Sequence, residues 1–342
     1  MKKLSILMIV VLSAASAGLL VFSACKSKTI EYPTETRETL GTKVTITLYA
    51  EGQLVDNIQR IFDQAFATMA HWEQMTLSGG DLNQVTKISE GAGTQSMTVD
   101  PEVFEMIMAA TRLHDSSGQL FDIRIGPLFD AWDFDSTPTV PDSATLAGAV
   151  ELVKNGGMFV AGKSILLAKE GMRFDVRHLV EGYIFDLIAK QLLEQGFLNF
   201  SIASPSVFLA VGNSPDQRGF DFALHHPLIA DSIWANVYVQ SGGYAYLSPI
   251  IGRFEQDGKF YHSLLNPMTG LPAENLAGTI VHAENAATAE AMAYAVFVRN
   301  PDQEIPEEGR ELIKGSIKIT SANGQFATET SGTLATGFEL VH

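Results

Sequence analysis

Side chains that could bind a metal ion or act as a nucleophile are sparse in this chain of 342 residues, which has eight histidines and one cysteine. His225 and His226 are adjacent, and such a pair first suggests zinc. However, no Cys or carboxylate stands at ligand spacing, and neighbouring strand residues face opposite ways. We therefore predict that both lie on the surface. No Gly-x-Gly-x-x-Gly segment opens a helix, which argues against a Rossmann dinucleotide site.

The single cysteine, Cys25, ends a targeting segment. Lys2 and Lys3 precede an apolar run from Leu4 to about Phe22, and Ser23-Ala24-Cys25 follows. Small residues before an unpaired cysteine resemble a bacterial lipobox, which predicts a signal peptide over residues 1–24 and a lipid on Cys25. The alternative is an uncleaved membrane anchor beside an incidental cysteine. Both alternatives predict an exported body, held on the periplasmic or outer face of an envelope membrane, with residues 25–35 as lipidated Cys and tether.

The composition favours a folded body that does not bind nucleic acid. Hydrophobic residues make up 46% of the chain and charged residues 18%, which is sufficient for a core. The formal net charge of −16 disfavours nucleic acid and anionic membrane surfaces as partners, because phosphate backbones are bound through Lys and Arg. A phosphate-containing ligand remains compatible with this charge if a metal ion or a helix N-terminus holds it.

The elements that must position a site follow one another without a regular βαβ rhythm, so we predict an α+β fold with one large domain over residues 36–342. Hydrophobic periodicity predicts helices at 54–74, 142–154, 180–195 and 287–298. A further helix should begin at Asp100-Pro101, an N-cap followed by proline, and end at Gly118. Strands are predicted at 44–48, 197–203, 207–211, 220–224, 234–239 and 278–282, with a hairpin over 317–328.

The segment Ser241–Pro272 contains the most specific pattern. Two strand-like runs flank Asp257-Gly258, a dipeptide that accommodates the positive φ angles of a tight hairpin turn. The second run ends in Asn266-Pro267-Met268-Thr269-Gly270-Leu271-Pro272, where proline and glycine predict a second, rigid turn.

The Ser-Gly-x-Tyr opening, the hairpin and the closing x-Pro-x-Thr-Gly-x-Pro together resemble the FAD:protein FMN transferase family, the ApbE-like lipoproteins. Further motifs similar to that family occur in its order along most of the chain: Leu40-Gly41-Thr42, Ser117–Ile123, Gly126-Pro127-Leu128, Phe174–Tyr183 with Asp186, and Ala289–Ala295. The resemblance implies transfer of FMN from FAD to a Thr or Ser hydroxyl of an envelope protein, with release of AMP. It also implies Mg²⁺ as cofactor and FAD as substrate.

The resemblance implies a site when the motifs are matched residue by residue. Ser263 stands at the position of the family's active-site histidine, so the candidate catalytic residues are Ser263, His262 one residue upstream, and Asn266. His262 would face the other side of a regular strand. The candidate metal-binding positions are Val180, Glu290, Ala293 and Tyr294. The candidate flavin contacts are Leu40, Leu120, Phe121, Asp122, Arg177, Tyr183 and Leu265.

The chain departs from the family pattern at several polar positions. Ser204-Pro205-Ser206 replaces a Gly-Gly-Asp/Glu segment, Gly243 replaces an aspartate, and Glu181 replaces a lysine, a known variant there. Tyr294 is neutral at pH 7 and is a poor metal ligand. Two alternatives to the transferase therefore stay open. One is a catalytically lapsed paralogue that acts as a ligand-binding or interaction lipoprotein, and the other is a metal-dependent FAD pyrophosphatase.

The matched residues also have plainer interpretations. Phe121 and Tyr183 are equally compatible with simple core packing. Glu290 and Tyr294 are equally compatible with ordinary positions on a helix.

Overall fold

The computed structural model describes residues 32–49, 57–229, 232–336 and 338–340. The predicted signal peptide, Cys25 and most of the predicted tether lie outside these described residues. Residues Tyr32–His342 form one compact unit. None of the helices in the described ranges is both long enough and apolar enough to cross a membrane.

The unit is built on an eight-stranded sheet in which every ladder is antiparallel. In spatial order its strands are β1 (Thr34–Thr39), β2 (Thr42–Leu48), β6 (Phe200–Ala203), β7 (Val207–Val211), β10 (Gly242–Leu247), β13 (Gly278–Ala283), β14 (Gly315–Ala322) and β15 (Gln325–Gly332). Three smaller sheets pair β16 (Phe338–Leu340), β9 (Ile233–Val239) and β8 (Phe220–His225); β3 (Met97–Thr98), β5 (Ser164–Leu167) and β4 (Met158–Ala161); and β11 (Phe254–Gln256) and β12 (Lys259–Tyr261).

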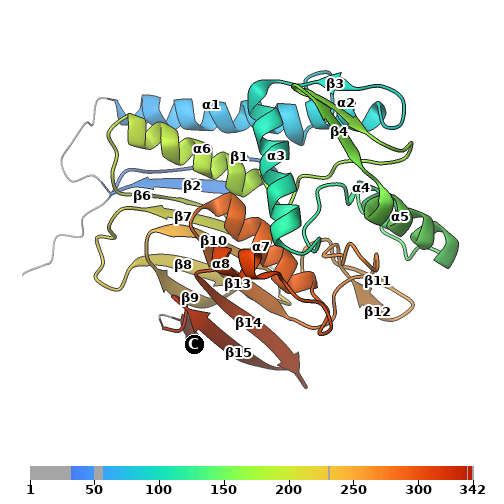
Figure 1. Ribbon diagram of the computed structural model, residues 1–342. Helices are drawn as coiled ribbons and strands as arrows, with labels where there is room; N and C mark the ends of the chain where they lie inside the picture. The colour runs from blue at the N-terminus through green and yellow to red at the C-terminus, as the bar shows by residue number, and fades with distance from the viewer. Residues whose placement is uncertain (1–31, 50–56, 230–231, 337, 341–342) are drawn as a thin grey trace, which may run out of the picture. The chain divides into compact units, whose positions relative to one another are not determined.

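Both faces of the large sheet are covered, and nearly every residue of its central strands β6, β7, β10 and β13 is buried. Successive strand residues point to opposite faces. On β10, Ala245 and Leu247 join the core beneath the helices. Tyr244 and Tyr246 join a second core that β8 and β9 complete. Figure 1 shows α1, α6 and α7 on one side of this sheet and β8 and β9 on the other.

Eight helices lie within the described residues. They are α1 (Ile58–Thr76), α2 (Gln84–Glu90), α3 (Pro101–Ser116), α4 (Gly126–Trp132), α5 (Ser143–Asn155), α6 (Val180–Glu194), α7 (Ala286–Val298) and α8 (Glu307–Leu312). The helices and strands predicted from periodicity are all present, with ends shifted by a few residues. The prediction of an α+β fold in a single large domain is confirmed.

Helix α7 is buried on almost every side, as expected for a helix that is apolar all round. It packs on β10 and β13 and against α6. Gly182 makes the close approach of α6 possible, since a Cβ atom there would lie 2.5 Å from the Ala286 carbonyl oxygen. The Asp186 carboxylate of α6 accepts hydrogen bonds from the amides of Ala286 and Ala287, both at 2.9 Å, and so caps α7.

Candidate functional site

A cavity of about 440 Å³ lies where α6 begins, beside α7 and the end of β10. Its volume falls within the usual range for small-molecule sites, roughly 300–1,000 Å³. Its lining residues are Arg177, His178, Glu181, Pro205, Ser206, Val207, His225, His226, Ile229, Tyr246, Leu247, Ser248, Ile250, Ile251 and Glu290. Part of the lining is apolar, formed by proline and aliphatic side chains. Two carboxylates also line it, Glu181 from α6 and Glu290 from α7.

The two glutamates are positioned by the contact between α6 and α7. Glu290 is 4% exposed, and its Oε2 accepts a hydrogen bond of 2.8 Å from the Gly182 amide. Glu181 Oε2 accepts a hydrogen bond of 3.0 Å from the Ser206 hydroxyl. Its other oxygen, Oε1, is buried without a hydrogen-bond partner. Burial raises the pKa of Glu181, and burial together with the charge of Glu181 raises the pKa of Glu290 well above its ordinary value.

Arg177 does not neutralise this pair, because its guanidinium is already held by other carboxylates. Nε and Nη2 donate to the two oxygens of Asp175 at 2.8 and 2.7 Å, and Nη2 also donates to Asp135 at 2.8 Å. The same group lies over the Phe129 ring, 4.2 Å from its centroid. Arg177 therefore lines the cavity with its charge already paired.

His178 enters the cavity as a neutral side chain. Its ring lies 4.7 Å from the Tyr294 ring, and Nε2 is buried without a hydrogen-bond partner. Burial lowers its pKa to about 4, so the imidazole is uncharged at pH 7. His225 and His226 also line this cavity and are partly buried, so our prediction of a surface position was wrong in this respect. The His226 ring packs at 5.3 Å on that of Phe326.

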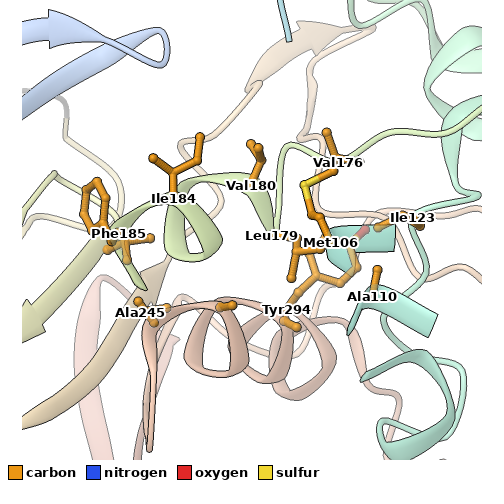
Figure 2. Packing of buried hydrophobic residues seen from close by; sticks show 14 of the residues in the cluster. Met106, Ala110, Ile123, Val176, Leu179, Val180, Ile184, Phe185, Ala245 and Tyr294 are labelled. Carbon is orange, nitrogen blue, oxygen red and sulfur yellow. The ribbon is translucent and has the colours of Figure 1, made fainter. Parts of the chain in front are cut away.

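Three of the four predicted metal-binding positions offer no free side-chain donor. The Tyr294 hydroxyl donates a hydrogen bond of 2.6 Å to the Leu265 carbonyl, and burial raises its pKa, so it stays protonated. Figure 2 shows this side chain within the packed cluster beside the start of α6. Val180 points away from α7 in the same view, and Ala293 is fully buried. Glu290 is the predicted position that retains a carboxylate in the cavity.

Glu181 was absent from our predicted site, yet it gives the cavity a second carboxylate. The sequence held a signal for it: the family's acid is missing at Ser206 and an acid has appeared at position 181, and these two side chains touch. In the described ranges, no group of three or more His, Cys, Asp or Glu residues is arranged to hold a metal ion. However, Mg²⁺ is usually bound by one or two carboxylates, with water and phosphate at its remaining positions. Glu181 and Glu290 therefore fit that ion.

The predicted catalytic residues make internal hydrogen bonds around the second turn. Asn266 Nδ2 donates to the Val298 carbonyl at 2.8 Å, and its Oδ1 accepts from the Met268 amide at 2.9 Å. Ser263 Oγ donates to the Ile251 carbonyl at 3.1 Å. These polar groups shape the polypeptide beside the cavity, which Ile251 lines.

His262 and Ser263 follow the end of β12 and are therefore not part of a regular strand. His262 lines a separate cavity of about 450 Å³. Its Nε2 lies 2.8 Å from the Ala273 carbonyl and its Nδ1 accepts from the Leu264 amide at 3.2 Å, so we assign the Nε2–H tautomer. Burial lowers the pKa of His262. The structure thus does not bring His262 and Glu290 to one cavity.

Of the predicted flavin contacts, Arg177 lines the 440 Å³ cavity, and Asp122 lines a separate cavity of about 210 Å³. The other five lie in packed surroundings. Leu40, Leu120, Phe121 and Leu265 are core residues. The Phe121 ring meets that of Tyr294 at 6.4 Å, and the partly buried Tyr183 meets Trp72 at 5.6 Å. Asp122 is paired with Arg124 at 2.8 Å.

The substitution at Gly243 has a packing reason. A Cβ atom at Gly243 would lie 2.2 Å from the Asn285 carbonyl carbon, at the N-terminus of α7. No side chain fits between β10 and α7 at this point, so an aspartate there would require the helix to move.

Solved structures with the same fold define the class of protein. The ApbE protein from Thermotoga maritima superposes with a TM-score of 0.76 at 22% identity, covering 88% of this chain and 97% of that one. The flavinyl transferase ApbE from Pseudomonas stutzeri, in its apo form, gives 0.75 at 20% identity, covering 90% and 98%. The fold is therefore that of the ApbE proteins.

The sequence comparisons reach the same class independently. A model of the ApbE family matches residues 40–318, and the chain belongs to this family. It is 26% identical over 243 residues to a protein of Klebsiella pneumoniae named FAD:protein FMN transferase, covering 69% of this chain and 72% of the relative. It is 22% identical over 297 residues to the Vibrio cholerae protein of the same name, covering 84% and 87%.

Proposed function

We propose that this protein is a FAD:protein FMN transferase that moves FMN from FAD to a Thr or Ser hydroxyl of an envelope protein and releases AMP. The observation that carries the proposal is the 440 Å³ cavity, which combines an apolar lining with Glu290 on α7. Family membership and the names of the relatives support the same activity.

The cavity offers separate surroundings for the two parts of a flavin nucleotide. Val207, Ile250 and Ile251 provide apolar surface for a flat aromatic ring, and burial of such a ring excludes water. Glu290 would hold a Mg²⁺ ion, whose chemistry is to neutralise charge on a pyrophosphate. In the transfer, the acceptor hydroxyl oxygen bonds to the phosphorus next to riboflavin, the bond to the AMP oxygen breaks, and the hydroxyl proton passes to water.

The test is incubation of residues 26–342 with FAD, Mg²⁺ and a candidate acceptor protein, followed by measurement of AMP and of protein-bound flavin fluorescence. We expect AMP and acceptor-bound FMN in equal amounts, and a large loss of both in Glu290→Gln. AMP without labelled acceptor would instead indicate the FAD pyrophosphatase. Flavin binding without AMP would indicate a ligand-binding paralogue, and no binding at millimolar FAD would overturn both enzymatic proposals.

We further propose that the protein is an exported lipoprotein whose anchor is a lipid on Cys25. The proposal is supported by the Lys-flanked apolar run and the small residues before the only cysteine. Replacing Cys25→Ser should abolish incorporation of labelled lipid while leaving the folded unit intact. Unchanged labelling would contradict the assignment.

A further inference from the structure

We propose that Glu181 and Glu290 together bind a hard divalent cation in the cavity, with Glu181 as its second carboxylate ligand. The inference rests on the proposed function only in that such a cation would meet a phosphate-containing substrate. Binding of the cation itself can be measured without FAD and without an acceptor.

The two carboxylates are placed so that one ion can contact both. They come from different helices and line one cavity. The helices are linked there because Glu290 Oε2 accepts a hydrogen bond from the amide of Gly182, the residue that follows Glu181. The Ser206 hydroxyl orients Glu181 through its Oε2. This leaves Glu181 Oε1 buried and without a partner. A buried oxygen of this kind is costly unless a ligand completes it.

The described residues provide the two carboxylates with no paired positive charge. No ion pair of Glu181 or Glu290 with Lys, Arg or His occurs within the described ranges. Arg177 lines the cavity, but its guanidinium is already paired with the carboxylates of Asp135 and Asp175. Two buried carboxylates without a counter-charge are unfavourable, and a divalent cation supplies that charge directly.

Carboxylate oxygens in a roomy cavity select a hard divalent cation. Mg²⁺ and Mn²⁺ favour carboxylate oxygen and accept water or phosphate at their remaining positions. The cavity provides room for both, with a volume of about 440 Å³. The Tyr294 hydroxyl is not available as a ligand, because it donates to the Leu265 carbonyl. Glu181 therefore supplies a ligand oxygen, which Tyr294 cannot supply.

The experiment is a titration of the full chain with Mn²⁺ in the absence of FAD, with free Mn²⁺ followed by electron paramagnetic resonance. We expect one bound ion per chain, displaced by excess Mg²⁺. Glu181→Gln and Glu290→Gln should each weaken binding at least tenfold. The matched control is Glu274→Gln, an exposed carboxylate paired with Lys259 at the other cavity, which should bind as the parent does.

Thermal unfolding provides a second readout and a check on folding. Mn²⁺ should raise the melting temperature of the parent and of Glu274→Gln but not that of Glu181→Gln, since only a ligand that binds the folded state stabilises it. Full-strength binding in Glu181→Gln, or no binding by the parent, would overturn the inference. A third outcome separates the two proposals. If the parent binds Mn²⁺ and Glu181→Gln does not, while the parent transfers no FMN, the cation site is supported and the proposed function is contradicted.

Discussion

Replacing Gly182 by alanine tests the packing that positions both glutamates. In α6 the new Cβ atom would meet the Ala286 carbonyl oxygen at 2.5 Å, its carbon at 2.6 Å and the Ala287 nitrogen at 2.8 Å. All three atoms belong to the backbone of α7, so no side chain can rotate out of the way. The two helices must separate, and the Gly182–Glu290 hydrogen bond and the Asp186 cap must lengthen with them.

The magnitude follows from two opposing effects. Overpacking of a core costs about 1–3 kcal/mol, and sometimes more. Alanine in place of glycine inside a helix gains roughly 0.5–1 kcal/mol. We therefore expect a net loss of about 1–2 kcal/mol in the free energy of unfolding. The matched control is Gly148→Ala in α5, where nothing lies within 4 Å of the new Cβ, and there the gain should appear unopposed.

The assay is urea unfolding of the parent and both variants, followed by far-ultraviolet circular dichroism. Opposite signs are expected for the same substitution in the two helices. If Gly182→Ala were as stable as Gly148→Ala, α6 and α7 would have room between them that the structure does not show, and the predicted overpacking would be refuted. Mn²⁺ affinity should fall in Gly182→Ala and remain unchanged in Gly148→Ala.

Two further substitutions probe the same region. Burial raises the pKa of Asp186 from 3.8 to about 6, so its contribution to stability is present at low pH and is lost as the pH rises through 6. The free energy of unfolding of the parent, relative to that of Asp186→Asn, should therefore increase as the pH falls from 7 to 4.5, by at most about 3 kcal/mol. Urea unfolding across this pH range measures the difference, and the absence of an increase would contradict the raised pKa. Tyr294→Phe leaves the Leu265 carbonyl without its donor and should cost about 1–3 kcal/mol of unfolding free energy while Mn²⁺ affinity stays unchanged. A tenfold loss of Mn²⁺ affinity in that variant would mean that the hydroxyl is a ligand after all.

The features that sequence predicted best are those determined by neighbouring residues. Asp257 and Gly258 adopt φ angles of 53° and 76°, as their hairpin turn requires. Asp142 caps α5 by accepting from the Ala144 and Thr145 amides, where the helix was predicted to begin. Such signals depend on the chemistry of a few adjacent residues, so they can be read without knowing the tertiary structure.

The features that sequence did not predict depend on residues far apart in the chain. Glu181 and Glu290 are 109 positions apart, and neither has a local pattern that points to the other. The close approach at Gly243 depends on where α7 begins, and the glycines of β10 do not by themselves identify the segment that approaches them. Asn266 shows the same limit, since its partner Val298 lies at the end of a distant helix. A polar residue in a motif can thus stabilise a turn by hydrogen bonds, and its presence alone does not identify a catalytic role.

The two-sided burial of the large sheet has a consequence for how the cavity fluctuates. Every residue of β10 and β13 is buried, whereas the outermost strand, β15, is largely exposed. Backbone amides in β10 and β13 should therefore exchange with deuterium most slowly, since they open only when both cores are lost, and those of β15 much faster. Tyr246 and Leu247 line the cavity from β10. This wall of the binding site belongs to the slowest-exchanging part of the protein, and it keeps its shape while the far edge of the sheet opens and closes.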